Sequence, residues 1–178
     1  ILHRCLTTGV YQTEAVLPSQ SPSMDIQVSS NFERALFDAL GRDGRAVAAL
    51  MGDLRTTGRF TVPQGALQAL REVFDSGRVS EDETAATIAR TLKASGELLC
   101  PHSAVGVAVA EQHLGANPMI TLATAHPAKF PDAVQAATGL RPALPPRMAD
   151  LFDRPERVTR MANDRAALQA LVLERTGA

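Results

Sequence analysis

The 178-residue sequence has few cysteines, few lysines, no excess of charge of one sign and no long apolar run. Its 18 basic and 19 acidic residues leave a formal charge of −1, which favours neither a nucleic-acid backbone nor an anionic membrane as a partner. Apolar runs such as residues 104–110 are far too short to span a bilayer. What remains is the composition of a globular protein long enough for one domain with a sizeable core.

The scarcity of cysteine and lysine limits the chemistry further. Cys5 and Cys100 do not make a disulfide framework, and no secretory apolar segment is present, so we expect a cytoplasmic location. Lysine chemistry must use Lys93 or Lys129, or lie outside this chain. The chain starts at Ile1 without an initiator methionine and leads directly into plausible structure, which indicates a piece of a longer protein.

Apolar residues at helical spacing predict a mainly helical chain. Capping boxes are expected at Ser30–Glu33 and Ser80–Glu83, and glycines after the apolar stripes mark helix ends. The expected helices cover residues 31–40, 47–54, 63–74, 81–92, 103–114, 131–138, 148–153 and 164–176.

Two short apolar runs interrupt the helical pattern. Met119–Thr124 is continuous enough for a strand buried on both faces, and Leu98–Cys100 is a shorter candidate. The order strand, helix, strand, helix predicts an α/β fold, predominantly helical with a few parallel strands. Further strands from outside this chain would complete the sheet. We expect a core segment over residues 1–147 and closing helices over residues 148–178.

The first polar stretch that breaks the amphipathic pattern is Ser21–Ile26. The two hydroxyls of Ser21 and Ser23 and the carboxylate of Asp25 could line a polar cleft. The alternative interpretation is a loop held by Asx-type and serine-type turns.

The second stretch, Cys100–Ser103, lies between an expected strand and an expected helix. Helix N-termini suit anions, but His102 or Ser103 could equally serve as a helix cap. A Cys-x-His pair without a third and fourth ligand is a poor zinc site, so we expect no metal here.

The third stretch follows the expected buried strand, at the edge where ligands bind in open α/β sheets. It brings Thr124, His126 and Lys129 into quick succession. Alternatively, Thr124 and His126 cap the next helix and Lys129 is solvated. The sequence contains neither a Gly-x-Ser-x-Gly motif nor a glycine-rich phosphate loop. The residues alone therefore predict that a ligand binds at this edge of the sheet, but they do not identify a reaction.

All three stretches carry a family resemblance. The fourteen residues Ser21–Arg34, SPSMDIQVSSNFER, closely resemble a signature of threonine synthase in the longer form of many bacteria and fungi. Pro101–Gly106 and Thr124–Phe130 resemble two further motifs of that family in the right order, and the likeness extends to about Gly139. The chain is thereby identified as the carboxyl-terminal part of a family member.

The resemblance implies a partial pyridoxal-phosphate enzyme of fold type II, the tryptophan-synthase β-chain group. Such enzymes convert O-phospho-L-homoserine and water to L-threonine and phosphate, the last step of threonine biosynthesis. The Schiff-base lysine and the phosphate-binding loop would lie upstream of Ile1, because Lys129 belongs to the third motif. The missing amino-terminal half is therefore the expected partner, and the chain alone, without a catalytic residue of its own, is expected to be inactive.

The resemblance also suggests site residues. Thr124 matches the threonine that hydrogen-bonds the pyridine nitrogen, where a hydroxyl supports a neutral ring. His126 is expected beside the cofactor. The expected substrate cleft comprises Ser21, Ser23, Asp25 and Lys129. Where the family usually has aspartate before the Pro-His pair, this chain has Cys100, so a carboxylate that could position His102 is absent.

Two alternatives remain open. One is another fold-type II enzyme, such as an amino-acid dehydratase or a sulfhydrylase. The other is a free-standing helical interaction module, which would fold cooperatively as a monomer and bind no cofactor.

Overall fold

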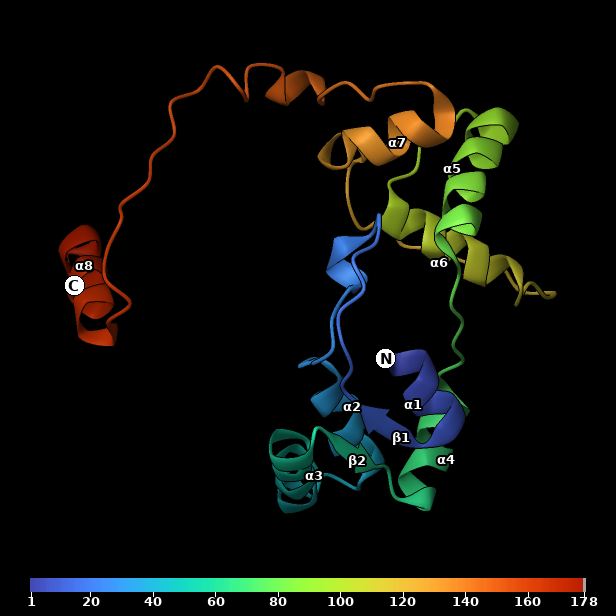
Figure 1. Cartoon of the computed structure of the whole chain (residues 1–178), viewed down its shortest axis with the longest axis vertical. Helices are drawn as coiled ribbons and strands as arrows, with labels where there is room; N and C mark the ends of the chain where they lie inside the picture. Colours follow the sequence, from blue (N-terminus) through green and yellow to red (C-terminus); the bar gives the residue numbers. More distant parts are fainter. Residues whose placement is uncertain (178) are drawn as a thin grey trace. The chain divides into compact units, whose positions relative to one another are not determined.

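The computed structural model describes residues 1–177 and divides the chain into two compact units, Ile1–Ala143 and Leu144–Ala178. Helices dominate both units, as expected (Figure 1). No helix within the described residues combines the length and the apolar character that crossing a membrane requires. All the candidate site residues lie in the first unit.

A small two-stranded antiparallel sheet with four helices around it forms the first group of elements (Figure 1). Strand β1 (Val10–Gln12) pairs with β2 (Arg59–Thr61), and the rings of Tyr11 and Phe60 stack with centroids 4.9 Å apart. The core between the sheet and the helices is closed by Leu36, Leu54 and Leu70. The helices of this group are α1 (Leu2–Thr8), α2 (Phe32–Ala39), α3 (Gly44–Thr57) and α4 (Gln64–Val73).

Three helices form the second group, and α5 (Glu81–Ser95) is its centre. Both α6 (Pro101–Glu111) and α7 (Pro131–Thr138) pack on α5 (Figure 1). One fully buried side chain from each helix fills the contact region: Ile88, Ala104 and Val134. The two expectations on which this group depends are confirmed, since Ser80 and Glu83 form a capping box and Gly96 and Gly139 end helices in the left-handed conformation.

The second unit contains the 3₁₀ helix η3 (Pro146–Met148) and helix α8 (Arg165–Thr176), whose first turn is capped by the Asp164 carboxylate. The expected helix over residues 164–176 is confirmed. The expected helix over residues 148–153 is wrong, because this stretch forms turns beyond η3. Its two large apolar residues, Leu151 and Phe152, remain exposed, and a short helix without packing is not stable.

The capping box expected at Ser30–Glu33 is also wrong. Asn31 precedes α2, and no side chain there accepts a hydrogen bond from the helix. The chain already turns at Ser29, whose carbonyl accepts from Phe32 N–H, and the Ser30 carbonyl accepts from Glu33 N–H. Backbone oxygens therefore take the role expected of the Ser30 hydroxyl.

The parallel strands are not confirmed. Within residues 1–177 the only sheet is the antiparallel β1–β2 pair, and both Leu98–Cys100 and Met119–Thr124 lie outside it without regular secondary structure. Ile120 and Leu122 are 82% and 76% exposed. Their apolar character is that of a buried strand, but a strand also needs a neighbour for its backbone hydrogen bonds, and the described residues supply none.

The segment that joins the two groups passes close to α6. A Cβ atom added to Gly77 would lie 2.8 Å from Val109 Cγ1, a distance that real Cβ atoms do not tolerate. Next to it, the Asp75 carboxylate contacts His113 Nδ1 at 3.0 Å, and Ser76 Oγ lies 3.0 Å from His3 Nδ1. The absence of a side chain at residue 77 thus permits this close approach.

We predict that Gly77→Ala lowers the free energy of unfolding by about 1–3 kcal/mol, because the new methyl group overpacks against Val109. Adding Val109→Ala should recover part of the loss. Gly65→Ala is the matched control: nothing lies within 4 Å of its Cβ position in α4, so helix propensity should leave stability unchanged or raise it by up to about 1 kcal/mol. Urea unfolding followed by circular dichroism checks all three, and equal stability of the Gly77 and Gly65 variants would contradict the close approach.

Candidate functional site

The Ser21–Asp25 loop is ordered by its own polar groups. It contains the 3₁₀ helix η1 (Pro22–Met24), and Ser21 is buried. The Asp25 carboxylate accepts from the backbone N–H of Ser19 at 2.7 Å and from its hydroxyl at 2.6 Å. Ser19 Oγ also lies 3.2 Å from Ser21 Oγ. The Asp25 carboxylate therefore closes the loop by a contact with a residue six positions earlier, which is not an Asx-type turn, whereas Ser19 Oγ accepts from Ser21 N–H in a turn of the serine type.

The same loop is attached to the first turn of α6. The backbone N–H of Ser23 donates to Nε2 of His102 at 3.1 Å, across 79 residues of sequence. The imidazole is 6% exposed and packs against the ring of Phe130, with centroids 4.6 Å apart and a 49° tilt. Because Nε2 accepts a hydrogen bond, the proton of the neutral ring lies on Nδ1.

Burial lowers the pKa of His102 below its ordinary value near 6.5, because the charged ring loses hydration. The Lys129 ammonium lowers this pKa further, and the Asp25 carboxylate opposes both effects. The structure thus brings three of the stretches singled out in the sequence to one imidazole, which is neutral at physiological pH.

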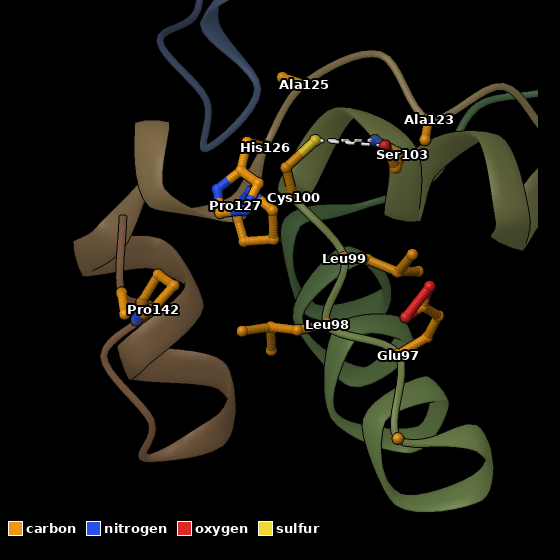
Figure 2. A pocket seen from close by; sticks show the side chains of 12 residues that line it. Glu97, Leu98, Leu99, Cys100, Ser103, Ala123, Ala125, His126, Pro127 and Pro142 are labelled. Carbon is orange, nitrogen blue, oxygen red and sulfur yellow. Dashed lines mark hydrogen bonds between the residues drawn. The ribbon is translucent and has the colours of Figure 1, made fainter. Parts of the chain in front are cut away.

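The first turn of α6 also holds the segment that contains Thr124. Cys100 Sγ accepts from the N–H of Ser103 at 3.4 Å, and Ser103 Oγ in turn accepts from the N–H of Thr124 at 3.3 Å. Figure 2 shows the contact between the sulfur of Cys100 and Ser103. A Cβ atom at Gly106 would lie 3.0 Å from Thr121 Cγ2, so the small residues of α6 let this segment lie close to the helix.

Position 100 acts as a helix cap. The sulfur of Cys100 accepts from the amide three residues further on, and the contact of His102 Nε2 is with Ser23 rather than with residue 100. Sulfur is a weaker acceptor than a carboxylate oxygen, so cysteine is a modest cap where the resemblance leads one to expect aspartate.

The remaining predicted residues lie around the turn after Thr124. The side chain of Thr124 is exposed. His126 Nδ1 accepts from Ala128 N–H at 3.1 Å and caps the 3₁₀ helix η2 (Pro127–Lys129), as one interpretation of the sequence proposed. Lys129 Nζ lies 5.9 Å from the centroid of the Phe130 ring.

Two cavities are lined by predicted site residues, whereas Thr124 and Lys129 line neither of them. One, of about 640 Å³, is bordered by the first turn of α6 and by the residues on either side of Thr124. In Figure 2, His126 and Pro127 lie beside Cys100, and Leu98 points toward Pro142. The lining residues used below are Cys100, Ser103, Ala123, Ala125 and His126.

The second cavity, of about 470 Å³, is lined in part by the polar loop and by the start of α5. Its polar lining residues are His3, Ser19, Ser21, Ser23, Asp25, Arg78 and Glu81. Glu81 also accepts from the backbone N–H of Gln20 at 2.7 Å. The three predicted cleft residues of this loop therefore line one cavity, and His126 lines the other.

Sequence reasoning missed Ser19 and the role of Ser103. Ser103 had been named only as a possible cap, whereas it connects Cys100 to Thr124. No local pattern carries this information, because the contact with Thr124 spans 21 residues. Within residues 1–177 no three His, Cys, Asp or Glu side chains gather as metal ligands.

The comparisons with known proteins all find similarity to threonine synthases. A family model described as "Threonine synthase, C-terminal" matches residues 103–172. The threonine synthase of Pseudomonas aeruginosa is 49% identical over 175 residues, which cover 97% of this chain, and that of Methylobacillus glycogenes is 37% identical over 182 residues, covering 98% of the chain. The chain spans only 37% and 38% of the length of these two curated relatives.

Solved structures give the same picture. A pyridoxal-phosphate-bound threonine synthase from Brucella melitensis superposes with a TM-score of 0.88 at 49% identity, and the yeast threonine synthase with 0.78 at 30% identity. Each match covers 99% of this chain, but only 38% of the Brucella chain and 40% of the yeast chain.

We predict that Cys100→Ala lowers the free energy of unfolding by about 1 kcal/mol, because the N–H of Ser103 loses its acceptor at the start of α6. Cys100→Ser keeps an acceptor of the same geometry and should be at least as stable as the parent chain. Thermal unfolding of the two variants measures the difference. Identical stabilities would show that the sulfur does not cap the helix.

Proposed function

The chain belongs to the threonine synthase family, where it corresponds to a carboxyl-terminal part, and we propose that it forms one wall of the cofactor cleft of such an enzyme. The complete enzyme would convert O-phospho-L-homoserine and water to L-threonine and phosphate. The lysine that anchors the cofactor would be supplied by the part of the family fold that this chain does not cover. One geometric observation supports the proposal: buried Ser103, which lines the 640 Å³ cavity, fixes the backbone of the exposed residue Thr124, and its neighbours Ala123 and Ala125 line the same cavity.

The residues around Thr124 fit a planar pyridine cofactor. The neighbours Ala123 and Ala125 line the cavity with methyl groups only, which leaves room for a ring. The N–H of Thr124 donates to Ser103, and its hydroxyl has no hydrogen-bond partner among residues 1–177, so the hydroxyl could donate to a ring nitrogen. When bound, pyridoxal phosphate supplies an electron sink, and a neutral donor keeps that sink weaker than a carboxylate would. His126 would form part of the cavity wall, held in place by its bond to Ala128.

The polar loop fits the substrate side of the cleft. Ser21, Ser23 and Asp25 line the second cavity, where hydroxyls and a carboxylate could orient a charged amino acid. Because the Asp25 carboxylate is engaged by Ser19, its role would be to hold the loop. Lys129 takes part in no ion pair with the described carboxylates, so its ammonium is available to attract a phosphorylated substrate.

The missing half of the enzyme would also complete the fold. Met119–Thr124 has the composition of a buried strand and lies outside the β1–β2 sheet, which suits a parallel strand that pairs with the rest of the enzyme. Residues 1–147 would then belong to the core segment of the complete fold, and residues 148–178 would contribute α8. A reducing cytoplasm suits the two buried free thiols, Cys5 and Cys100.

We predict that the 178-residue chain, supplied with pyridoxal phosphate and O-phospho-L-homoserine, releases no phosphate above background. The complete enzyme should release phosphate and L-threonine in equal amounts. A colorimetric phosphate assay with amino-acid analysis measures both. Turnover by the chain alone would overturn the assignment of the anchoring lysine to another segment, and 2-oxobutanoate as the main product of the complete enzyme would point to a dehydratase.

We predict that Thr124→Val in the complete enzyme shifts the absorbance of the bound cofactor and lowers kcat about fivefold, because the ring nitrogen loses a hydrogen bond worth about 1 kcal/mol. Thr124→Ser keeps the hydroxyl and should retain the parent spectrum. Because residue 124 is exposed, both variants should fold as the parent does, and circular dichroism checks this. An unchanged spectrum and rate in the valine variant would remove Thr124 from the site.

A further inference from the structure

His102 stands out because its polar atoms are buried and only one of them has a partner. Nε2 accepts from the N–H of Ser23, whereas Nδ1 is buried without a hydrogen-bond partner among residues 1–177. A buried donor without a partner lowers the stability of the fold. The hydrogen bond from Ser23 to Nε2, which attaches the Ser21–Asp25 loop to α6, offsets this cost.

That attachment is the direct polar contact between η1 and α6. Asp25 accepts two hydrogen bonds from Ser19, and Ser19 Oγ lies 3.2 Å from Ser21 Oγ, which fixes the shape of the loop but not its position. The Gln20 N–H bond to Glu81 fixes the residue just before the loop against α5. The Ser23–His102 bond fixes its middle, which lines the second cavity.

The attachment requires a neutral ring. In the protonated ring both nitrogens carry hydrogen, so Nε2–H would face the N–H of Ser23 and the bond would be replaced by a repulsion between two donors. The charged groups facing the imidazole are Lys129, beside Phe130, and Asp25, in the loop itself. The ammonium and the burial favour the neutral ring, and the Asp25 carboxylate, which favours the charged ring, already accepts two hydrogen bonds from Ser19.

We propose that His102 is a positioning residue whose neutral, Nδ1-protonated imidazole holds the Ser21–Asp25 loop in place at the substrate side of the cleft. The consequence for substrate binding rests on the proposed function, whereas the attachment itself is a property of this chain. The adjacent Ser103 accepts a hydrogen bond from Thr124. His102 and Ser103 therefore connect the Ser21–Asp25 loop and the segment that contains Thr124 to a single turn of α6.

The attachment is tested first in the unaltered 178-residue chain. Long-range ¹H–¹⁵N spectra should show the Nδ1–H tautomer of His102 near neutral pH. On acidification the Ser23 amide resonance should move with the same midpoint as the imidazole, and its hydrogen exchange should accelerate. Because the folded pKa lies below the unfolded value near 6.5, the chain should lose stability as the pH falls below about 6.5. An Nε2–H tautomer, or a Ser23 amide that ignores the titration, would refute the proposal.

A pair of variants separates positioning from packing. His102→Gln can place Oε1 near the original Nε2 and accept from Ser23, whereas His102→Leu fills the space without an acceptor. We expect protection of the Ser23 amide to persist in the glutamine variant and to fall about tenfold in the leucine variant, while the amide of Ser80 in the α5 capping box serves as the internal control. Equal loss at Ser23 in both variants, with Ser80 unchanged, would mean that the imidazole only fills space.

The complete enzyme provides the functional readout. His102→Leu should raise KM for O-phospho-L-homoserine about tenfold with a smaller change in kcat, and His102→Gln should restore KM and remove the acidic limb that His102 contributes to the pH profile of kcat/KM. If the complete protein has no threonine synthase activity, the proposed function fails and the amide measurements alone decide the attachment. Normal KM and an unchanged pH profile in both variants would refute the positioning role.

Discussion

The first turn of α6 is the constraint on which the candidate site depends. Pro101, His102, Ser103 and Ala104 are all buried there, because α6 packs on α5 with side chains small enough for close contact. Two buried polar atoms of this turn, Nε2 of His102 and Oγ of Ser103, find partners in two distant segments, at Ser23 and Thr124. A single turn of helix therefore sets the positions of a polar loop and of an exposed hydroxyl that neither segment could set by itself.

Much of the helical structure was predictable because helix signals are local. The capping box at Ser80–Glu83 and the glycines after α5 and α7 act within one turn of the chain, and the structure confirms them. The stretch at residues 148–153 shows the limit of such reasoning. Its spacing favours a helix, but Leu151 and Phe152 find no apolar surface, and packing rather than spacing decides whether a short helix forms.

The strands and the site were harder to predict for a different reason. Met119–Thr124 has the composition of a buried strand, yet pairing depends on a neighbour that no property of the segment itself reveals. Motif resemblance located the three polar stretches, but not which atoms meet. The Ser23–His102 contact joins residues 79 positions apart, and it uses a backbone amide that is the same in every residue except proline.

The use of a backbone amide decides which residues position 23 can hold. His102 accepts a hydrogen bond from the main chain of the loop and does not use the exposed side chain of Ser23. Many residue types at position 23 would therefore keep this hydrogen bond. Each of them would change the surface that the loop offers to a ligand. Proline at position 23 is the one replacement that would remove the hydrogen bond outright, because proline has no backbone N–H.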